Sequence, residues 1–103
     1  MSDLPGEMRF QAVVVHWRGP SPFFFAVVPE TYAPVLRKAG RAVSYGWGMI
    51  PIEARIGDIA FRTALIPKDG TYFLPLKDQV RRQADISLGD TLTVMLRIPD
   101  KTA

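Results

Sequence analysis

The clearest pattern in this chain is a regular alternation of apolar and polar positions over residues 50–65. Two alternating runs, 50–56 and 59–65, flank the pair Gly57-Asp58. A two-residue loop that contains glycine is typical of a tight β-hairpin, because glycine readily takes the positive φ that the favoured turns require. The pattern and the turn agree, so this stretch predicts one hairpin around which the rest of the chain is organised.

The two-residue loop also fixes the register of the hairpin. Ile56 must lie opposite Ile59, and Glu53 must lie opposite Arg62. The large apolar side chains then share one face, while Glu53 and Arg62 form a pair of opposite charge on the other face.

Other segments rich in β-branched and aromatic residues also predict strands, and they cover residues 8–17, 23–28, 71–74 and 91–98. The first is apolar at consecutive positions from Val13 to Val15. Such a run indicates either burial on both faces or a strand that passes through a curved barrel. The first two segments, separated by a turn with glycine and two prolines, predict a second hairpin.

Two short helices are predicted, over residues 32–39 and 76–84. Thr31 is placed to cap the first helix, and Gly40 is expected just after its end. Each helix follows a strand and a proline, which suggests two similar halves. Six short strands with two helices predict a mainly β fold, a small β-barrel.

Length and composition predict one domain over residues 8–98, with flexible termini at 1–7 and 99–103. The chain has no cysteine, so it has no disulfide, thiolate nucleophile or cysteine-bound metal. Its N-terminus lacks a signal-peptide pattern, and its apolar runs are far shorter than the ~20 residues of a membrane helix. We therefore expect a cytoplasmic protein without membrane contact.

The net charge does not favour nucleic-acid binding, and the motifs do not favour catalysis. The formal charge of +3 is modest and spread along the chain, whereas nucleic-acid binders usually carry a clustered basic stripe. His16 is the only histidine, and without a partner cysteine we expect it to have a hydrogen-bonded structural role. Phosphate-loop, dinucleotide, zinc-protease and nucleophile-elbow motifs are all absent. We expect neither a metal nor another cofactor.

Four residues are the candidates for ligand contact: Trp17, Trp47, Arg62 and Arg81. Trp47 lies between two glycines, where a ring can serve as a stacking platform or as a lid packed on a barrel end. Arg62 is either paired with Glu53 or open to a ligand. Two basic patches are predicted, which can equally be solvated helix faces: Lys77, Arg81 and Arg82, and Arg37, Lys38 and Arg41.

Short motifs occur in a characteristic order along nearly the whole chain, namely Trp17-Arg18-Gly19, Val28-Pro29, Gly46-Trp47-Gly48, Ile56-Gly57, Arg62-Thr63 with Leu65, Gly70 with Leu74-Pro75, Val80-Arg81, and Gly89-Asp90 before Val94. In these motifs the chain resembles a bacterial family catalogued as domain of unknown function 1905. The resemblance implies a double-split β-barrel, an architecture shared with AbrB-like regulators and certain antitoxins that bind DNA as interlocked dimers. It implies no activity, substrate or catalytic residue.

Two hypotheses about function follow. The leading one is a non-enzymatic binding module for a small molecule or a protein partner. The alternative is a DNA-binding regulator that acts as an AbrB-like dimer, although fold alone does not transfer function. Both a monomer and a homodimer are compatible with the sequence.

Overall fold

The structure, a computed structural model, describes residues 7–17, 23–41 and 48–99. Its elements are, in chain order, β1 (Glu7–Trp17), β2 (Phe23–Val27), the 3₁₀ turn η1 (Glu30–Tyr32), α1 (Ala33–Gly40), β3 (Ile50–Ile56), β4 (Ile59–Lys68), β5 (Thr71–Pro75), α2 (Asp78–Gln83) and β6 (Thr91–Arg97). The predicted fold class, a mainly β barrel of six strands with two short helices, is confirmed.

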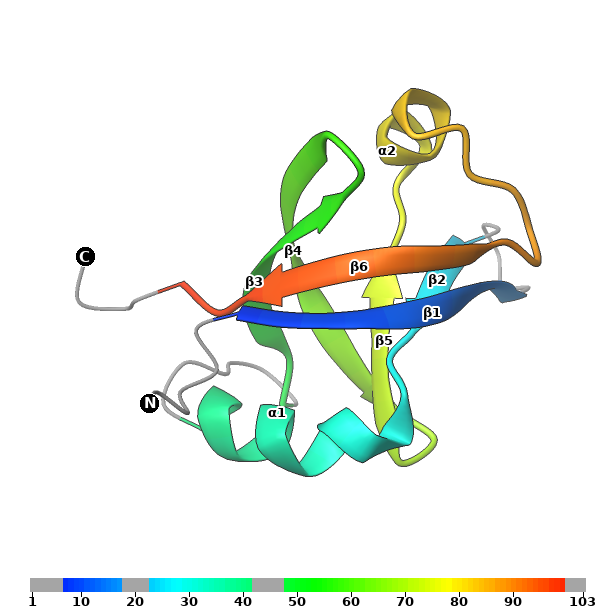
Figure 1. The fold of residues 1–103 in the computed structure, drawn as a ribbon. Coiled ribbons are helices and arrows are strands. Elements are labelled where there is room, and N and C mark those ends of the chain that lie inside the picture. The colour runs from blue at the N-terminus through cyan, green and yellow to red at the C-terminus, as the bar shows by residue number, and fades with distance from the viewer. Residues whose placement is uncertain (1–6, 18–22, 42–47, 100–103) are drawn as a thin grey trace.

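The strands form one closed antiparallel barrel in the order β1-β2-β5-β4-β3-β6 (Figure 1). If β1 is exchanged with β4, β2 with β5, and β3 with β6, every pair of neighbouring strands is again a pair of neighbours in the barrel. Each half also runs strand, strand, helix, strand. The strand pairing therefore has the two-fold pattern that two similar halves produce, and α1 and α2 lie at opposite ends of the barrel (Figure 1).

The organising hairpin has the predicted register. Ile56 pairs with Ile59 and Glu53 pairs with Arg62, and the carboxylate of Glu53 lies 3.0 Å from the Arg62 guanidinium. Gly57 has a φ of +61° in the connecting turn. Ile52 and Ile56 are buried, so the apolar face of β3 forms part of the barrel core.

The apolar run in β1 is not buried on both faces. The strand alternates, with Val14 1% exposed and its neighbour Val13 48% exposed. The other interpretation, a strand passing through a curved barrel, fits this result. β1 pairs with β6 along its first part and with β2 along its last part, so it crosses from one side of the barrel to the other.

The ends of α1 differ from the prediction. Thr31 lies in η1 and does not cap the helix, which begins at Ala33 without a side-chain cap. Gly40 is the last helical residue and its φ is not positive. It is buried against Ile50, so the glycine permits a close approach of the helix to β3 rather than a left-handed stop.

The bounds of α2 and β4 also differ from the prediction. α2 begins at Asp78 and ends at Gln83, within the predicted 76–84. β4 continues to Lys68, so the turn before β5 contains only Asp69 and Gly70, both with positive φ. The hydroxyl of buried Thr71 donates a 2.7 Å hydrogen bond to the carbonyl of Val28 and joins β5 to the end of β2.

Candidate functional site

Four aromatic side chains form a cluster on the outer side of β1, β2 and β5, which we call the aromatic surface: Trp17, Phe23, Phe25 and Phe73. Phe25 is at its centre, with ring centroids 6.2 Å from Trp17, 6.3 Å from Phe23 and 5.6 Å from Phe73. Phe23 and Phe25 point the same way because side chains alternate along a strand. The cluster therefore rests on strand pairing and is held rigidly.

Half of this cluster is open to solvent. Trp17 and Phe23 pair across the hairpin and are 49% and 51% exposed, while Phe25 and Phe73 beneath them are buried. The Lys68 ammonium lies 4.5 Å from the Trp17 ring centroid, a favourable cation–π distance. Within the described chain Lys68 has no carboxylate partner. The surface thus presents two apolar rings beside one cation.

More exposed apolar residues lie toward the same end of the molecule. Val13 is on the outward face of β1, and Leu88 is in the loop that leads to β6. Hydrogen bonds from the amide of Gly89 to the carbonyl of Val14, and from Val14 to Asp90, hold that loop against β1. Figure 1 shows this loop beside the end of β1 and the start of β2.

The candidate arginines serve local structure. Arg62 points outward from β4 to Glu53, with 82% of its side chain exposed. Arg81 is bound on both sides, because its Nε donates to the carbonyl of Leu76 at 3.2 Å and its guanidinium lies 4.1 Å above the Phe24 ring. No hydrogen bond, ion pair or ring contact joins these arginines to Trp17 within the described residues.

The two predicted basic patches are also separate. Arg37, Lys38 and Arg41 lie on or just after α1, whereas Lys77, Arg81 and Arg82 lie at α2. The helices are at opposite ends of the barrel (Figure 1). Asp78 neutralises part of the second patch, since its carboxylate lies 3.3 Å from Arg81 and 2.6 Å from Arg82. Trp47, the remaining candidate, lies outside the described residues.

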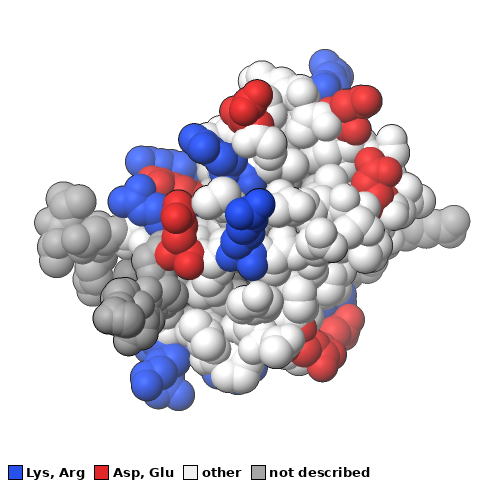
Figure 2. All heavy atoms as spheres, viewed as in Figure 1, with Lys and Arg blue, Asp and Glu red and all other residues white. Residues whose placement is uncertain are grey.

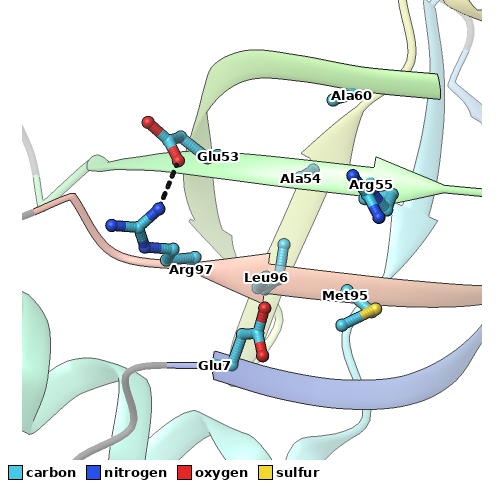
Figure 3. Close-up of a pocket in the computed structure, with 8 residues that line it drawn as sticks. All are labelled: Glu7, Glu53, Ala54, Arg55, Ala60, Met95, Leu96 and Arg97. Carbon is cyan, nitrogen blue, oxygen red and sulfur yellow. Dashed lines mark hydrogen bonds and ion pairs between the residues drawn. The ribbon is translucent and has the colours of Figure 1, made fainter. Parts of the chain in front are cut away.

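A row of alternating charges crosses the outer face of β1, β6, β3 and β4. Arg97 pairs in register with Glu7 on one side and with Glu53 on the other, and Glu53 in turn pairs with Arg62. The Glu53 carboxylate lies 3.3 Å from Arg97 and 3.0 Å from Arg62. Figure 3 shows the Glu53–Arg97 contact at the edge of a shallow pocket of about 220 Å³.

The next row of the same face has a different composition. Met95 of β6 pairs with Arg9 of β1 on one side and with Arg55 of β3 on the other. A second pocket, of about 270 Å³, is lined by Arg9, Arg55, Met95, Thr93 and Gly57, and we call it the arginine groove. Arg55 and Met95 also line the first pocket, and Figure 3 shows them on the side of that pocket away from the Glu53–Arg97 pair.

The sequence interpretation missed the members of both surfaces except Trp17. Phe23 and Phe25 belong to a continuous run of three phenylalanines, which does not show which of the rings face outward. Arg9 and Arg55 are 46 positions apart in the sequence, and only the pairing of β6 with both strands brings them together. No pattern within one segment carries that information.

Two further polar residues, His16 and Asp90, make contacts that are typical of structural roles. His16 is exposed and packs on Phe24, with ring centroids 4.9 Å apart; the hydrogen bond predicted for it is not found among the described residues. Asp90 accepts a 2.8 Å hydrogen bond from the amide of Ser87, as expected of a turn aspartate. Over residues 7–17, 23–41 and 48–99, no three His, Cys, Asp or Glu side chains are grouped closely enough to hold a metal ion.

Fold and surfaces together define a small antiparallel β-barrel with an aromatic surface and an arginine groove. The sequence profile of the family described as Domain of unknown function (DUF1905) matches residues 10–96. Since the match covers most of the chain, the protein belongs to this family, as the resemblance predicted. A comparison with curated proteins finds no significant match. In the described part of the chain, no helix is long and apolar enough to cross a membrane.

Proposed function

We propose that this protein is a non-enzymatic binding module that recognises a protein partner through the aromatic surface. The observation that carries the proposal is the pair Trp17 and Phe23, half exposed on top of the buried Phe25 and Phe73. Large aromatic side chains left in water forgo the stabilisation of burial, and rigid aromatic anchors are the residues that dominate protein interfaces.

The surroundings of Trp17 indicate the chemistry of the partner. Two rings open to solvent favour an aliphatic or aromatic side chain that completes their packing. Lys68, 4.5 Å from the Trp17 ring centroid, favours a carboxylate close to that side chain, because the ammonium is desolvated when the surface is covered. The partner segment is therefore apolar with an adjacent Asp or Glu.

Selection of peptides from a random linear library on the wild-type protein tests the proposal. We expect enriched peptides that combine a large apolar residue with a carboxylate. Trp17→Ser and Phe23→Ser should each weaken binding of these peptides about tenfold or more, as truncation of aromatic interface anchors does. Val35→Ser is the matched control, because Val35 is an exposed apolar residue on α1, away from the aromatic surface.

Three outcomes would contradict the proposal. One is that no peptide of this class is enriched, and another is that Trp17→Ser and Val35→Ser weaken binding equally. The third is a dimer in sedimentation experiments that Trp17→Ser dissociates, since the surface would then be covered by a second copy of the chain. Melting temperatures of all variants establish that the compared proteins are folded.

The DNA-binding alternative stays an untested prediction, and no observation favours it over a protein partner. The basic residues of the two helices are at opposite ends of the barrel, and Asp78 pairs with two of them. A continuous basic surface is what phosphate backbones require. A cytoplasmic location likewise remains a prediction.

A further inference from the structure

The arginine groove lies on a face that is more basic than the rest of the barrel. The outward positions of β1, β6, β3 and the first half of β4 carry four arginines, Arg9, Arg55, Arg62 and Arg97, against two glutamates, Glu7 and Glu53. Figure 2 shows blue and red groups gathered over these strands and a mostly white surface toward the end of β1. The charges are therefore local to one part of the face.

Within this face the charges are unequally paired. Glu53 engages both Arg97 and Arg62, so its carboxylate is committed to the row of alternating charges. Arg9 and Arg55 make no ion pair with any residue in the described ranges. Both are exposed, and only Met95 separates them in the sheet.

The spacing suits one anionic group. Arg9 and Arg55 are on strands that flank β6, so their backbones are about 9.6 Å apart at the usual interstrand distance. Two long guanidinium side chains can close on one group above Met95 from that separation. A phosphate offers several oxygens to two planar donor forks, which is the geometry that arginine recognises best.

The groove adds two features that define the ligand further. Thr93 is an exposed hydroxyl on the groove side of Met95, and it can donate to a further phosphate oxygen. Met95 is half-buried and supplies an apolar floor for the body of the ligand. The neighbouring pocket shares Arg55 and Met95 with the groove, but Glu7 and Glu53 also line it, and their carboxylates make it less favourable for an anion.

We propose that the arginine groove binds the phosphate group of a small phosphorylated molecule, with Arg9 and Arg55 as the phosphate ligands and Met95 under the apolar body. This inference concerns a different surface from the one proposed for the protein partner, and it holds whether or not that proposal does. Its carrying observation is the juxtaposition, across one methionine, of two arginines that pair with no carboxylate of the described residues.

Amide chemical-shift titrations of the full chain test this inference at constant ionic strength. The probes are phenyl phosphate, inorganic phosphate and benzoate. We expect saturable shifts at Arg9, Arg55, Thr93 and Met95 with both phosphates. Phenyl phosphate should bind more tightly than inorganic phosphate because its ring covers Met95, and benzoate should bind most weakly because it offers only two oxygens.

Arg9→Gln and Arg55→Gln should each raise the dissociation constant for phenyl phosphate about tenfold, the effect of losing a charge-assisted hydrogen bond. Arg62→Gln is the matched control. It removes the same charge from the same face, but from a residue already paired with Glu53, and it should leave the constant within about twofold, as expected for a screened, distant charge.

Several results would overturn the inference. Shifts that rise linearly without saturation, or an equal loss of affinity in Arg62→Gln and Arg55→Gln, would mean a diffuse electrostatic attraction and no site. Saturable binding of duplex DNA with no saturable binding of phenyl phosphate would assign the face to a nucleic-acid backbone. Equal affinity for benzoate and phenyl phosphate would show that the groove does not recognise the phosphate group.

Discussion

Gly40 offers a stringent test of how α1 is packed on the barrel. Replacing a glycine whose φ is not positive by alanine ordinarily stabilises a protein by about 0.4–1 kcal/mol, because the unfolded chain of the alanine variant has less conformational entropy to lose. At Gly40 a Cβ would lie 2.5 Å from Cδ1 and 2.7 Å from Cγ1 of Ile50. Carbon atoms in contact are ordinarily about 3.5–4.0 Å apart, so one of the two elements must move by roughly an ångström.

Ile50 cannot yield this space cheaply, because it is 1% exposed and protein cores are close-packed. Overpacking of such a core costs about 1–3 kcal/mol. After subtraction of this entropic gain, we expect Gly40→Ala to lower the free energy of unfolding by about 1–2 kcal/mol. Urea denaturation measures this directly, and the melting temperature should fall by about 4–8 °C for each kcal/mol.

The same substitution should behave differently once Ile50 is truncated. Ile50→Ala alone costs about 2–5 kcal/mol because it leaves a cavity. In that background the clash is gone, so adding Gly40→Ala should be neutral or stabilising. The double-mutant cycle then has a coupling energy of about 1.5–3 kcal/mol, in the range of residues in direct contact. A Gly40→Ala variant that is more stable than wild type, or equally destabilised in both backgrounds, would refute the packing argument.

Three further predictions concern the core and the turns, and urea denaturation measures each. Ile56→Ala should cost about 2–5 kcal/mol, and a loss under ~0.5 kcal/mol would mean that this face of the hairpin is not buried. Thr71→Val should cost about 1–2 kcal/mol, because the Val28 carbonyl loses its buried donor; an unchanged stability would contradict that hydrogen bond. Asp69→Gly should stabilise by up to about 1 kcal/mol and Gly70→Ala should destabilise by a similar amount, because both positions have positive φ; opposite signs would exclude the turn geometry.

Local signals were sufficient for the hairpin of β3 and β4. Its turn is two residues long, which fixes the register, and the alternation on both sides of the turn places the apolar side chains on one face. The Glu53–Arg62 pairing therefore follows directly from the sequence. The same holds for the fold class, since six strand-like segments separated by turn residues leave few alternatives to a small barrel. These features depend on residues close together in the chain.

Features that depend on distant partners were not predictable. The run around Val13 left two interpretations open, burial on both faces or a strand in a curved barrel, because sequence alone does not show which faces of a barrel strand have a neighbour. Gly40 looked like a helix stop because its contact with Ile50 is between separate elements. Thr31 had the right chemistry for a cap, but the chain enters α1 through a 3₁₀ turn, so Tyr32 occupies the N-cap position and Thr31 lies one residue before it.

The candidate site shows the same limit. Trp17 was chosen by residue type alone, and the structure shows that its ring is half exposed. Arg81 was chosen by type too, yet Leu76, Phe24 and Asp78 engage it in local contacts. Arg9 and Arg55 carry no distinguishing sequence signal, and their significance comes only from the strand order β1-β6-β3.

The outward face of β1 explains why the two proposed surfaces differ so sharply. Its outward side chains are charged or polar at Glu7, Arg9 and Gln11, and they are apolar at Val13 and Trp17. The change coincides with the change of partner, because β1 pairs with β6 up to Val13 and with β2 from Val14 onward. The polar half of β1 thus lies beside β6, and its apolar half lies beside β2.

Because β1 is one rigid strand, the two surfaces have a fixed separation. Arg9 and Trp17 are eight residues apart, which corresponds to about 26 Å along an extended strand. Substitutions that far apart without shared partners act additively. Arg9→Gln should therefore weaken phosphate binding without changing affinity for selected peptides, and Trp17→Ser should do the reverse. A variant that impairs both would mean that the two surfaces form a single site, with one ligand lying along β1.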